Sequence, residues 1–589
     1  MSQTSSIYLQ NLARAAKPYN RRLLIGLIAT MFASIAESAS PMLLKFGIDS
    51  IQAGKPDAWL WSLAGLIILV SAIGSIFRFQ MRDVIIGVSR WIEADLRENF
   101  FRHLLRLPPS FFDRNHTGDL MARATDDVER IRMVVGPAVL YTANTQLTLF
   151  FSAIMMFIVD YKLAALLLLL TPLVGGAMLW VARLLHKASL SQQVVFGELT
   201  TVVQENISGS RVIKSYARED YEAERFAEVC GRFFTCSLKV AQIQALMFPL
   251  ITFLIGLGVA GILWIGGTHV AAGSMSLGDF IAFMGYLSLM AWPMIALGWV
   301  VHLYQRGSAS NVRLSQVLDV PQQFVHSTEK PPEKVAGQLA APKILFDNVT
   351  FRYRPEGPDV LNDVTLHIPA GRTVAIVGQT GSGKSTVARL LVRLYEPQSG
   401  KILIDGKEWD KIPVDQLRAG IAYVDQTPFI FSAEIDTNLR LGKPEATPEE
   451  MAVAAHTACF DRDIAELPQQ YRTLIGERGV TLSGGQQQRL TLARALLIDA
   501  PVLALDDALS AVDADTEAEI ISRLNANLFG RTTILITHRL AAVEAADIVV
   551  VLDKGKIVEL GSPAELLGKG GLFAEMFRRQ RLAAEIEAS

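Results

Sequence analysis

The stretch VAIVGQTGSGKSTVARLLVRL, Val374–Leu394, decides the fold of the second half of the chain. It begins as a short apolar run, passes through a glycine-rich loop and continues with helical apolar spacing. The loop carries the pattern Gly378-x4-Gly383-Lys384-Ser385. In this pattern, backbone N–H groups wrap phosphate oxygens, the lysine reaches the β- and γ-phosphates, and the hydroxyl is a magnesium ligand. A strand before the loop and a helix after it are the context this motif requires. The second half of the chain is therefore expected to bind a nucleoside triphosphate.

A second acidic motif fits this expectation. The stretch PVLALDDALSAVDADTEAEI, Pro501–Ile520, starts as an apolar strand and ends that strand in two aspartates, Asp506 and Asp507. P-loop enzymes place an acid at the end of such a strand, where it holds the magnesium shell opposite the P-loop hydroxyl. We expect Asp506 to have this role opposite Ser385.

The first half of the chain is apolar enough to enter a membrane. The chain has 589 residues and a mean hydropathy of +0.30, and a membrane-spanning helix needs about 20 apolar residues. Six runs satisfy this requirement: 23–44, 58–77, 133–159, 163–182, 240–268 and 280–301. We therefore expect six membrane spans.

The loops between the spans set the orientation. The connections 78–132 and 183–239 hold ten and eight Lys/Arg, whereas the connections 45–57, 160–162 and 269–279 hold two, one and none. The positive-inside rule then places both long loops and both termini in the cytoplasm. Helical periodicity in the long loops predicts that the spans continue into the cytoplasm as helices.

These patterns divide the chain into an all-α part and an α/β part. Residues 1–320 are expected to form a six-helix transmembrane domain. Residues 321–343, rich in Pro, Gln and Lys, are expected to be a linker. From residue 344 to 589, alternating strands and the P-loop predict an α/β nucleotide-binding domain.

The stretch LSGGQQQR, Leu482–Arg489, resembles the signature of the ATP-binding cassette (ABC) transporters almost letter for letter. Six spans with long cytoplasmic loops ahead of one cassette resemble the half-transporters of the exporter type. The resemblance implies ATP as the nucleotide, Mg²⁺ as its metal, and the following roles at matching positions. The adenine would stack on Tyr353, and the phosphates would bind Gly378, Gln379, Thr380, Gly381, Ser382, Gly383, Lys384, Ser385 and Thr386. Mg²⁺ would be held by Ser385, Gln426 and Asp506, while Asp507, Gln426 and His538 would be catalytic.

The resemblance also implies a second chain. Ser483, Gly484, Gly485 and Gln486 open a helix, and free N–H groups at a helix start favour an anion. In this family that anion is the γ-phosphate bound by the P-loop of the other cassette. Two chains would therefore pair head to tail around two ATP molecules. Segments near 110–132 and 215–226 resemble the helices that couple the cassettes to the membrane domain.

Asp507 departs from the family, because the exporters usually carry glutamate there to polarise the attacking water. Aspartate has the same carboxylate on a stem one carbon shorter. The base then sits roughly 1 Å further back, a displacement that lowers rates on the order of 10²-fold. Two explanations remain open: a heterodimer in which this chain forms the degenerate site, and a homodimer with two slow sites. The heterodimer is the preferred interpretation.

The sequence says less about the cargo. Glu37 lies in the middle of the first span, where an acid needs a cavity or a partner. It is a candidate contact for a cationic substrate, and a helix-to-helix hydrogen bond is the alternative. We expect a hydrophobic drug-like compound or a lipid to be exported, with the bacterial inner membrane as the location.

Several other classes of function are weighed against this one. The chain has 56 Lys and Arg residues and 58 Asp and Glu residues. It therefore lacks the excess of positive charge that nucleic-acid-binding proteins use to bind phosphates. The three cysteines have no metal-ligand spacing, so a zinc site is not expected. An ATP-gated channel would share the whole architecture and remains an alternative that single-channel currents would reveal.

Overall fold

The computed structural model describes residues 16–322, 341–476, 479–527 and 530–588. Contacts divide the described residues into two compact units. The first comprises the residues up to Leu105 together with Thr117–Pro321, and the second comprises Arg106–His116 together with the residues from Gln322 onward. The expected linker 321–343 lies largely outside the described residues.

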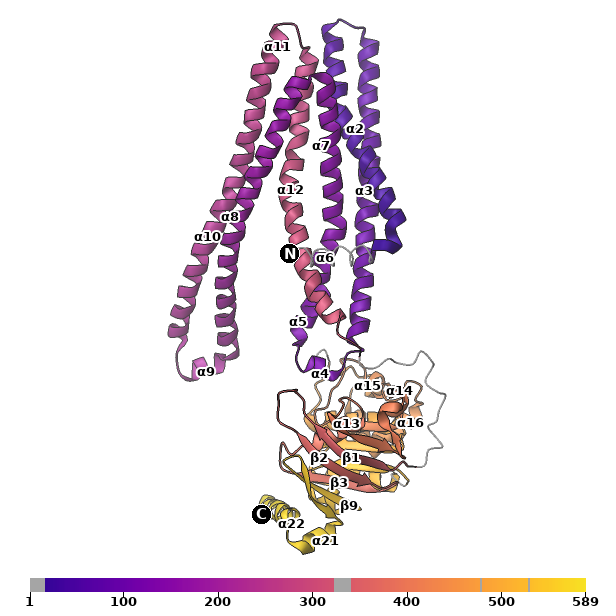
Figure 1. The fold of residues 1–589 in the computed structure, drawn as a ribbon. Coiled ribbons are helices and arrows are strands. Elements are labelled where there is room, and N and C mark those ends of the chain that lie inside the picture. The colour runs from indigo at the N-terminus through magenta and orange to yellow at the C-terminus, as the bar shows by residue number, and fades with distance from the viewer. Residues whose placement is uncertain (1–15, 323–340, 477–478, 528–529, 589) are drawn as a thin grey trace. The chain divides into compact units, whose positions relative to one another are not determined.

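The first unit is entirely helical (Figure 1). Its elements are η1 (Lys17–Tyr19), α2 (Asn20–Gln52), α3 (Asp57–Leu104), α5 (Thr117–Ala122), η2 (Arg123–Asp127), α6 (Val128–Met133), η3 (Val134–Ala138), α7 (Val139–Val159), α8 (Tyr161–Ser208), α9 (Ser210–Ser215), α10 (Glu219–Gly261), η4 (Ile262–Gly266), α11 (Gly267–Ala271) and α12 (Leu277–Leu318). The segments η2, η3 and η4 are π-helical turns that continue the neighbouring α-helices without a break.

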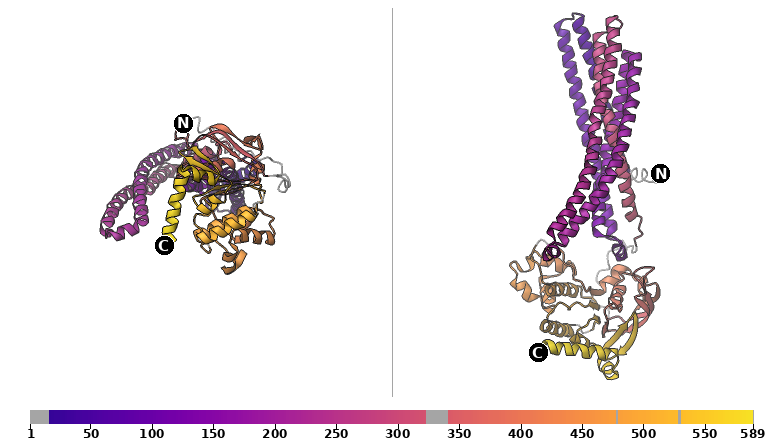
Figure 2. Two further views of the ribbon diagram at one scale, coloured as in Figure 1. Left: turned by 90° about the horizontal axis from the view of Figure 1, so that it is seen from below. Right: turned by 90° about the vertical axis from the view of Figure 1, so that its left-hand side faces the viewer.

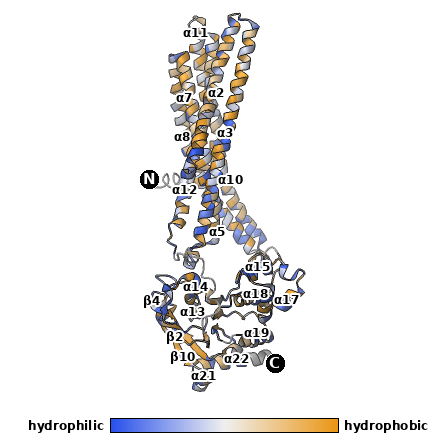
Figure 3. Cartoon of the chain, turned by 90° about the vertical axis from the view of Figure 1, so that its right-hand side faces the viewer, coloured by the Kyte–Doolittle hydropathy of each residue, from blue (hydrophilic) through white to orange (hydrophobic). Residues whose placement is uncertain are grey.

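Six continuous helical segments are long and apolar enough to cross a membrane. They are Lys17–Gln52, Asp57–Leu104, Thr117–Val159, Tyr161–Ser208, Glu219–Ala271 and Leu277–Leu318. Each apolar run expected from the sequence falls inside one of them, so the six-helix fold is confirmed. Every segment is longer than a bilayer requires. The second to fifth segments extend past their apolar runs into the charged sequence of the long loops 78–132 and 183–239. The hydropathy colouring shows this change along the helices (Figure 3).

The six segments form two groups within this unit. Helices α2, α3, α7 and α12 pack together, whereas α8 and α10 pair with each other along their length (Figures 1 and 2). The two groups meet at one end, where Leu163, Ile262 and Phe283 belong to a shared apolar core. Away from that end α8 and α10 diverge from the other helices, and apolar side chains such as Val194 and Phe234 are exposed there.

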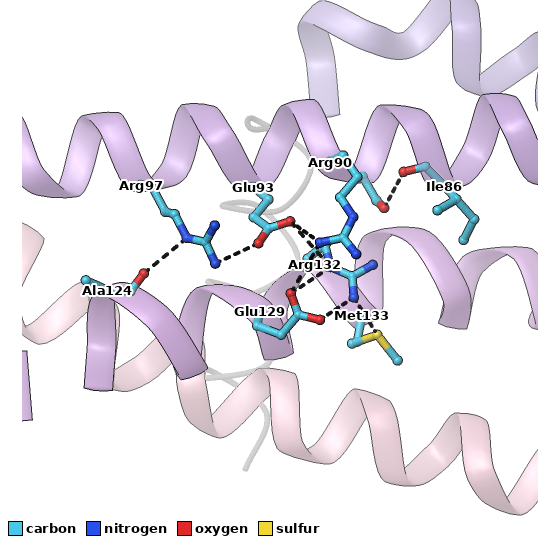
Figure 4. A network of polar contacts seen from close by, with 9 residues as sticks. Ile86, Arg90, Glu93, Arg97, Ala124, Glu129, Arg132 and Met133 are labelled. Carbon is cyan, nitrogen blue, oxygen red and sulfur yellow. Dashed lines mark hydrogen bonds and ion pairs between the residues drawn. The ribbon is translucent and has the colours of Figure 1, made fainter. Parts of the chain in front are cut away.

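A buried ionic network fastens α3 to α6 (Figure 4). Glu93 is only 4% exposed, and its carboxylate lies 2.9 Å from Arg90, 2.7 Å from Arg97 and 3.5 Å from Arg132. Arg132 is itself buried and binds Glu129 through its Nε at 2.9 Å. A buried charge needs such partners, because an unpaired one carries a large desolvation penalty. The network therefore holds these two helices in one register.

A second buried acid joins the same region to α12. Asp127, at the end of η2, accepts a 2.8 Å hydrogen bond from the Ser310 hydroxyl and pairs with Arg313. The Arg123 guanidinium donates to the Arg313 carbonyl at 3.0 Å. Polar contacts thus connect the second, third and sixth helical segments with one another.

The second unit contains all ten strands of the described residues. The strands are β1 (Ile344–Phe351), β2 (Leu361–Ile368), β3 (Thr373–Gly378), β4 (Ser399–Ile404), β5 (Lys407–Glu408), β6 (Ile421–Val424), β7 (Val502–Asp506), β8 (Thr532–Ile536), β9 (Ile548–Asp553) and β10 (Lys556–Gly561). The helices are α4 (Pro109–Phe112), α13 (Lys384–Leu391), η5 (Trp409–Lys411), α14 (Val414–Ala419), α15 (Ile435–Arg440), α16 (Pro448–Thr457), α17 (Asp461–Glu466), η6 (Gln470–Arg472), α18 (Gly484–Leu496), α19 (Ala514–Asn527), α20 (Leu540–Glu544), α21 (Pro563–Lys569) and α22 (Leu572–Ala588).

Two sheets build this unit. Strands β2-β1-β4-β5 form an antiparallel sheet, and β10-β9-β3-β8-β7-β6 form a larger sheet that is parallel except for β10. One core lies between the antiparallel sheet, α13 and the parallel sheet. A separate core holds α15 to α18 against β6 and β7. This arrangement is the predicted α/β cassette, so the fold class is confirmed.

Candidate functional site: an ATP-binding cassette

The P-loop lies between β3 and α13, as its sequence context predicts. Gly378 has φ +152°, and a Cβ there would lie 2.1 Å from the Leu552 carbonyl oxygen. Gly383 has φ +102° and caps the start of α13. The buried Lys384 side chain turns back and donates to the carbonyl oxygens of Gly378 (2.9 Å) and Gln379 (2.8 Å). The loop is therefore a tight backbone turn with an ammonium group held across it.

The other predicted phosphate-binding residues fall into an exposed group and a buried or partly buried group. Gln379, Thr380 and Gly381 form its exposed crest. Ser382 is buried with its hydroxyl unpartnered, Thr386 is buried within α13, and Ser385 is partly buried. The exposed crest and the free N–H groups at the start of α13 provide the donors that an anion requires.

The structure brings Ser385 and Asp506 together from positions far apart in sequence. The Ser385 hydroxyl donates to Asp506 Oδ1 at 2.9 Å. Asp506 is fully buried at the end of β7, and its Oδ2 atom has no hydrogen-bond partner. Burial raises the pKa of Asp506 to about 6, with the nearby acids Asp425 and Asp507 adding to the effect. A buried carboxylate oxygen without a partner beside a hydroxyl is a donor set that suits Mg²⁺.

Four parallel strands end at one edge and lead into the P-loop and the three residues predicted to be catalytic. Strands β3, β8, β7 and β6 are neighbours in the sheet. The P-loop follows β3, His538 follows β8, Asp507 follows β7 and Gln426 follows β6. Ligands of open α/β sheets bind at the carboxyl ends of the strands. Strand order therefore gathers at this edge residues that are spread along the sequence from Gly378 to His538.

Asp507 and His538 lie close to the P-loop lysine. Asp507 has φ +48° and its N–H donates to the Ile536 carbonyl at 2.7 Å, so its backbone is fixed in the left-handed region. The pKa of His538 is lowered, first by burial and then by the positive charge of Lys384. Burial also lowers the pKa of Lys384, which the charges of Asp507 and Asp506 partly oppose. Gln426 is exposed, and its N–H donates to the Asp425 side chain at 2.9 Å.

The signature residues lie elsewhere in the unit. Ser483 caps α18 by accepting from the N–H of Gln486, whose side chain accepts from the N–H of Ser483 at 2.9 Å. Gly484 and Gly485 form the first turn, and a Cβ on Gly485 would lie 2.8 Å from the Ala511 carbonyl oxygen. Among the described residues, no hydrogen bond or ion pair links this turn to the P-loop. The hydrogen bonds of this turn lie within α18 and between Gln486 and Asp463 of α17.

Tyr353 also lies near the P-loop helix. Its hydroxyl is 3.1 Å from the Thr386 hydroxyl, and its ring makes an edge contact with Tyr395 at 5.1 Å between centroids. Tyr395 in turn donates to Asp113 at 2.8 Å, in the segment that follows α4. Sequence reasoning missed the Tyr395 contact, since nothing in either local stretch indicates that the two meet.

Glu37 has a nearby cation of its own. Its Oε1 atom lies 3.9 Å from an Arg78 nitrogen on α3, and the Glu37 side chain is 29% exposed. The carboxylate thus faces an arginine of the neighbouring span. Its role as a substrate contact stays a prediction.

Comparisons with known proteins agree with this geometry. Residues 23–294 match the ABC transporter transmembrane region, and residues 361–510 match the ABC transporter family. The chain is 35% identical over 580 residues to a probable multidrug resistance ABC transporter ATP-binding/permease protein of Bacillus subtilis, with 98% of each chain covered. The chain belongs to the ABC transporters. This transporter is also 33% identical to an ATP-dependent lipid A-core flippase of Chromohalobacter salexigens, with 99% of each chain covered.

A solved structure supports the exporter class. The structure of a bacterial Atm1-family ABC exporter with ATP bound matches with a TM-score of 0.78 at 28% identity, covering 95% of this chain and 98% of that one. This ABC transporter is an integral multi-pass membrane protein of the exporter class. Its cassette binds ATP, and ATP hydrolysis is coupled to transport.

Proposed function

We propose that this ABC transporter exports hydrophobic drug-like compounds or lipids from the cytoplasm or the inner leaflet of a bacterial inner membrane. Its relatives include a probable multidrug resistance transporter and several lipid A-core flippases. Both kinds of cargo are amphipathic or apolar. The divergence of α8 and α10 from the other spans (Figure 1), with exposed apolar side chains such as Val194 and Phe234 on these two helices, supports an alternating-access cycle, in which the two groups of helices would move relative to each other.

The transporter acts as a dimer in this proposal. The observation that carries this is that, among the described residues, the signature turn, Ser483 to Gln486, makes no hydrogen bond or ion pair to the P-loop of the same chain. A helix start with free N–H groups is an anion site. It has no described phosphate-binding partner in its own chain, so a second chain is the natural source. Exposed apolar side chains on α8 and α10, among them Phe196 and Phe234, also need a covering surface.

Mg²⁺ is the proposed metal, and Ser385, Asp506 and Gln426 are its proposed ligands. When bound, the metal would neutralise phosphate charge and orient the leaving group. The protein itself positions its own groups: the P-loop N–H groups and Lys384 bind phosphate oxygens, and Asp507 orients a water. His538 stays neutral near pH 7, because burial and Lys384 lower its pKa, so it is available as a hydrogen-bond partner.

The site of this chain is proposed to be the degenerate one of a heterodimer. The support is Asp507, whose carboxylate is one carbon short while the other motif residues keep the family types. Its left-handed backbone adds a second consideration, because aspartate accepts this conformation more readily than longer side chains do. A homodimeric lipid flippase with two slow sites is the second candidate, favoured by the flippase relatives.

The decisive experiment purifies this chain alone in nanodiscs and measures its subunit count by native mass spectrometry and its ATPase rate. Lys384→Ala is the background control. A monomer or a nearly inactive dimer, activated by adding a partner half-transporter with glutamate at the matching position, supports the heterodimer. Rapid turnover by a stable homodimer refutes it.

The cargo is tested in inside-out vesicles with two probes. One is a fluorescent cationic dye, and the other is a short-chain fluorescent phospholipid whose leaflet is read by dithionite quenching. ATP-dependent movement of either probe that Lys384→Ala abolishes identifies the class. Movement of neither probe in an ATPase-active sample contradicts the proposed export of apolar or amphipathic cargo.

A further inference from the structure

Arg539, the residue after His538, makes contacts outside its own loop. Its NH2 group donates to the carbonyl oxygens of Ser510 at 2.8 Å and Val512 at 3.3 Å. Its NH1 group lies 3.1 Å from Glu517 Oε2. A planar guanidinium thus joins two backbone carbonyls and a carboxylate in one fixed geometry. We call Ser510–Asp513 the acceptor loop.

Glu517 is placed to hold Arg539 and little else. Its side chain is 5% exposed, and its other oxygen, Oε1, is buried without a hydrogen-bond partner. A buried carboxylate requires a nearby cation, and removing that cation leaves an uncompensated charge. The pair therefore fixes the guanidinium beside the first turn of α19, within hydrogen-bond distance of the acceptor loop.

The opposite side of the acceptor loop is held by the signature helix α18. Gln488 donates to the Ser510 hydroxyl at 2.9 Å and accepts from the Ala511 N–H at 2.8 Å. The first turn of α18 packs against the same backbone, since a Cβ on Gly485 would approach the Ala511 carbonyl oxygen to 2.8 Å. The acceptor loop is thus held on one side by Arg539 and on the other by α18.

The same loop leads directly from Asp507. The Ser510 N–H donates to the Asp507 carbonyl at 3.2 Å, which closes a turn between them. A continuous series of contacts therefore runs from His538 and Arg539 through the acceptor loop to Asp507 and to Gln488 on α18. His538 is joined to Arg539 by the peptide bond, and each of the other links is a hydrogen bond between described residues.

We propose that Arg539 is a positioning residue that fixes the acceptor loop, and through it aligns Asp507 with the signature turn of the same chain. This rests on the proposed function, in which that turn completes the site of a second chain. In such a dimer, Arg539 links the ATP site formed by the P-loop of its own chain to the ATP site that its signature turn completes on the second chain.

The test compares Arg539→Gln, Arg539→Lys, Gln488→Leu and the double variant Arg539→Gln/Gln488→Leu in the assembly that shows ATPase activity. The matched control is Arg531→Gln, because Arg531 lies at the other end of β8 and pairs with the surface acid Asp499. Thermal melts confirm folding of every variant. ATPase rates are measured over a range of ATP concentrations.

The inference predicts about tenfold or greater loss of turnover in Arg539→Gln and partial rescue in Arg539→Lys, which keeps the ion pair but loses the planar fork. The Hill coefficient for ATP should fall towards one. The double variant should be no slower than the slower single variant, because both act through the same loop. If the variants lost activity only because less protein folded, the Hill coefficient would be unchanged. The activity losses of the two single variants would then multiply in the double variant.

Three results would overturn the inference: wild-type kinetics in Arg539→Gln, multiplicative losses in the double variant, or an equal loss in Arg531→Gln. These outcomes are distinct from failure of the proposed function. That failure would appear as a wild-type assembly without ATP-dependent pairing or transport.

Discussion

Asp506→Asn should stabilise the transporter in the absence of magnesium while abolishing its ATPase activity. Asp506 is fully buried, and its pKa is raised from about 3.8 to about 6. A shift of about 2 pKa units corresponds to about 3 kcal/mol. Because the folded-state pKa of this acid is raised, the ionised carboxylate destabilises the fold. The penalty is complete above about pH 6 and is absent below about pH 4.

The neutral amide removes that penalty but introduces one of its own. Its NH2 group would replace Oδ2, which has no partner, and an unpaired buried donor costs about 1 kcal/mol or more. The net gain expected at pH 8 is therefore about 2 kcal/mol. For a domain of this size, that raises the melting temperature by roughly 4–8 °C.

The assay is thermal melting of the purified chain at pH 8 and pH 5, in EDTA and in Mg²⁺ with ATP. At pH 5 the carboxylate penalty drops to about half, so the advantage of the asparagine variant should shrink or disappear. Mg²⁺ with ATP should stabilise the wild type and not the variant. A variant that melts below the wild type at pH 8 in EDTA would refute this account of the buried carboxylate.

Three further predictions follow from the described contacts. Asp507→Glu should raise ATPase turnover by up to about 10²-fold if the short side chain limits the rate. The variant should also be less stable by about 1 kcal/mol, because glutamate accepts the left-handed backbone at this position less readily. An unchanged rate in the ATPase assay would mean that another step is limiting. Lys384→Ala should abolish ATP-dependent pairing in native mass spectrometry, and pairing that persists would contradict the role of the P-loop. Glu93→Gln should destabilise the membrane unit by about 3 kcal/mol, since it removes the buried negative charge that Arg90, Arg97 and Arg132 share. The exposed Glu98→Gln, which disrupts the surface pair with Arg102, should cost less than about 1 kcal/mol in the same melts.

The sequence by itself determined the parts of this transporter that depend on local pattern. The six spans are visible because a bilayer requires long apolar runs, and the positive loops set their expected orientation. The P-loop is visible because a phosphate-binding turn needs glycines and a lysine at fixed spacing, and Asp506 because it ends an apolar strand. These features are properties of a short stretch of chain, so residue order alone carries them.

Only the tertiary structure decided which distant residues meet. The sheet order places β8 between β3 and β7, and this brings His538, Asp507 and the P-loop to one edge, although no local pattern specifies that order. The same holds for the buried Glu93, for the Arg78 that lies opposite Glu37, and for the reach of Arg539 to the acceptor loop. Such contacts depend on how apolar faces pack and on which buried charges find partners, and these are properties of the whole fold.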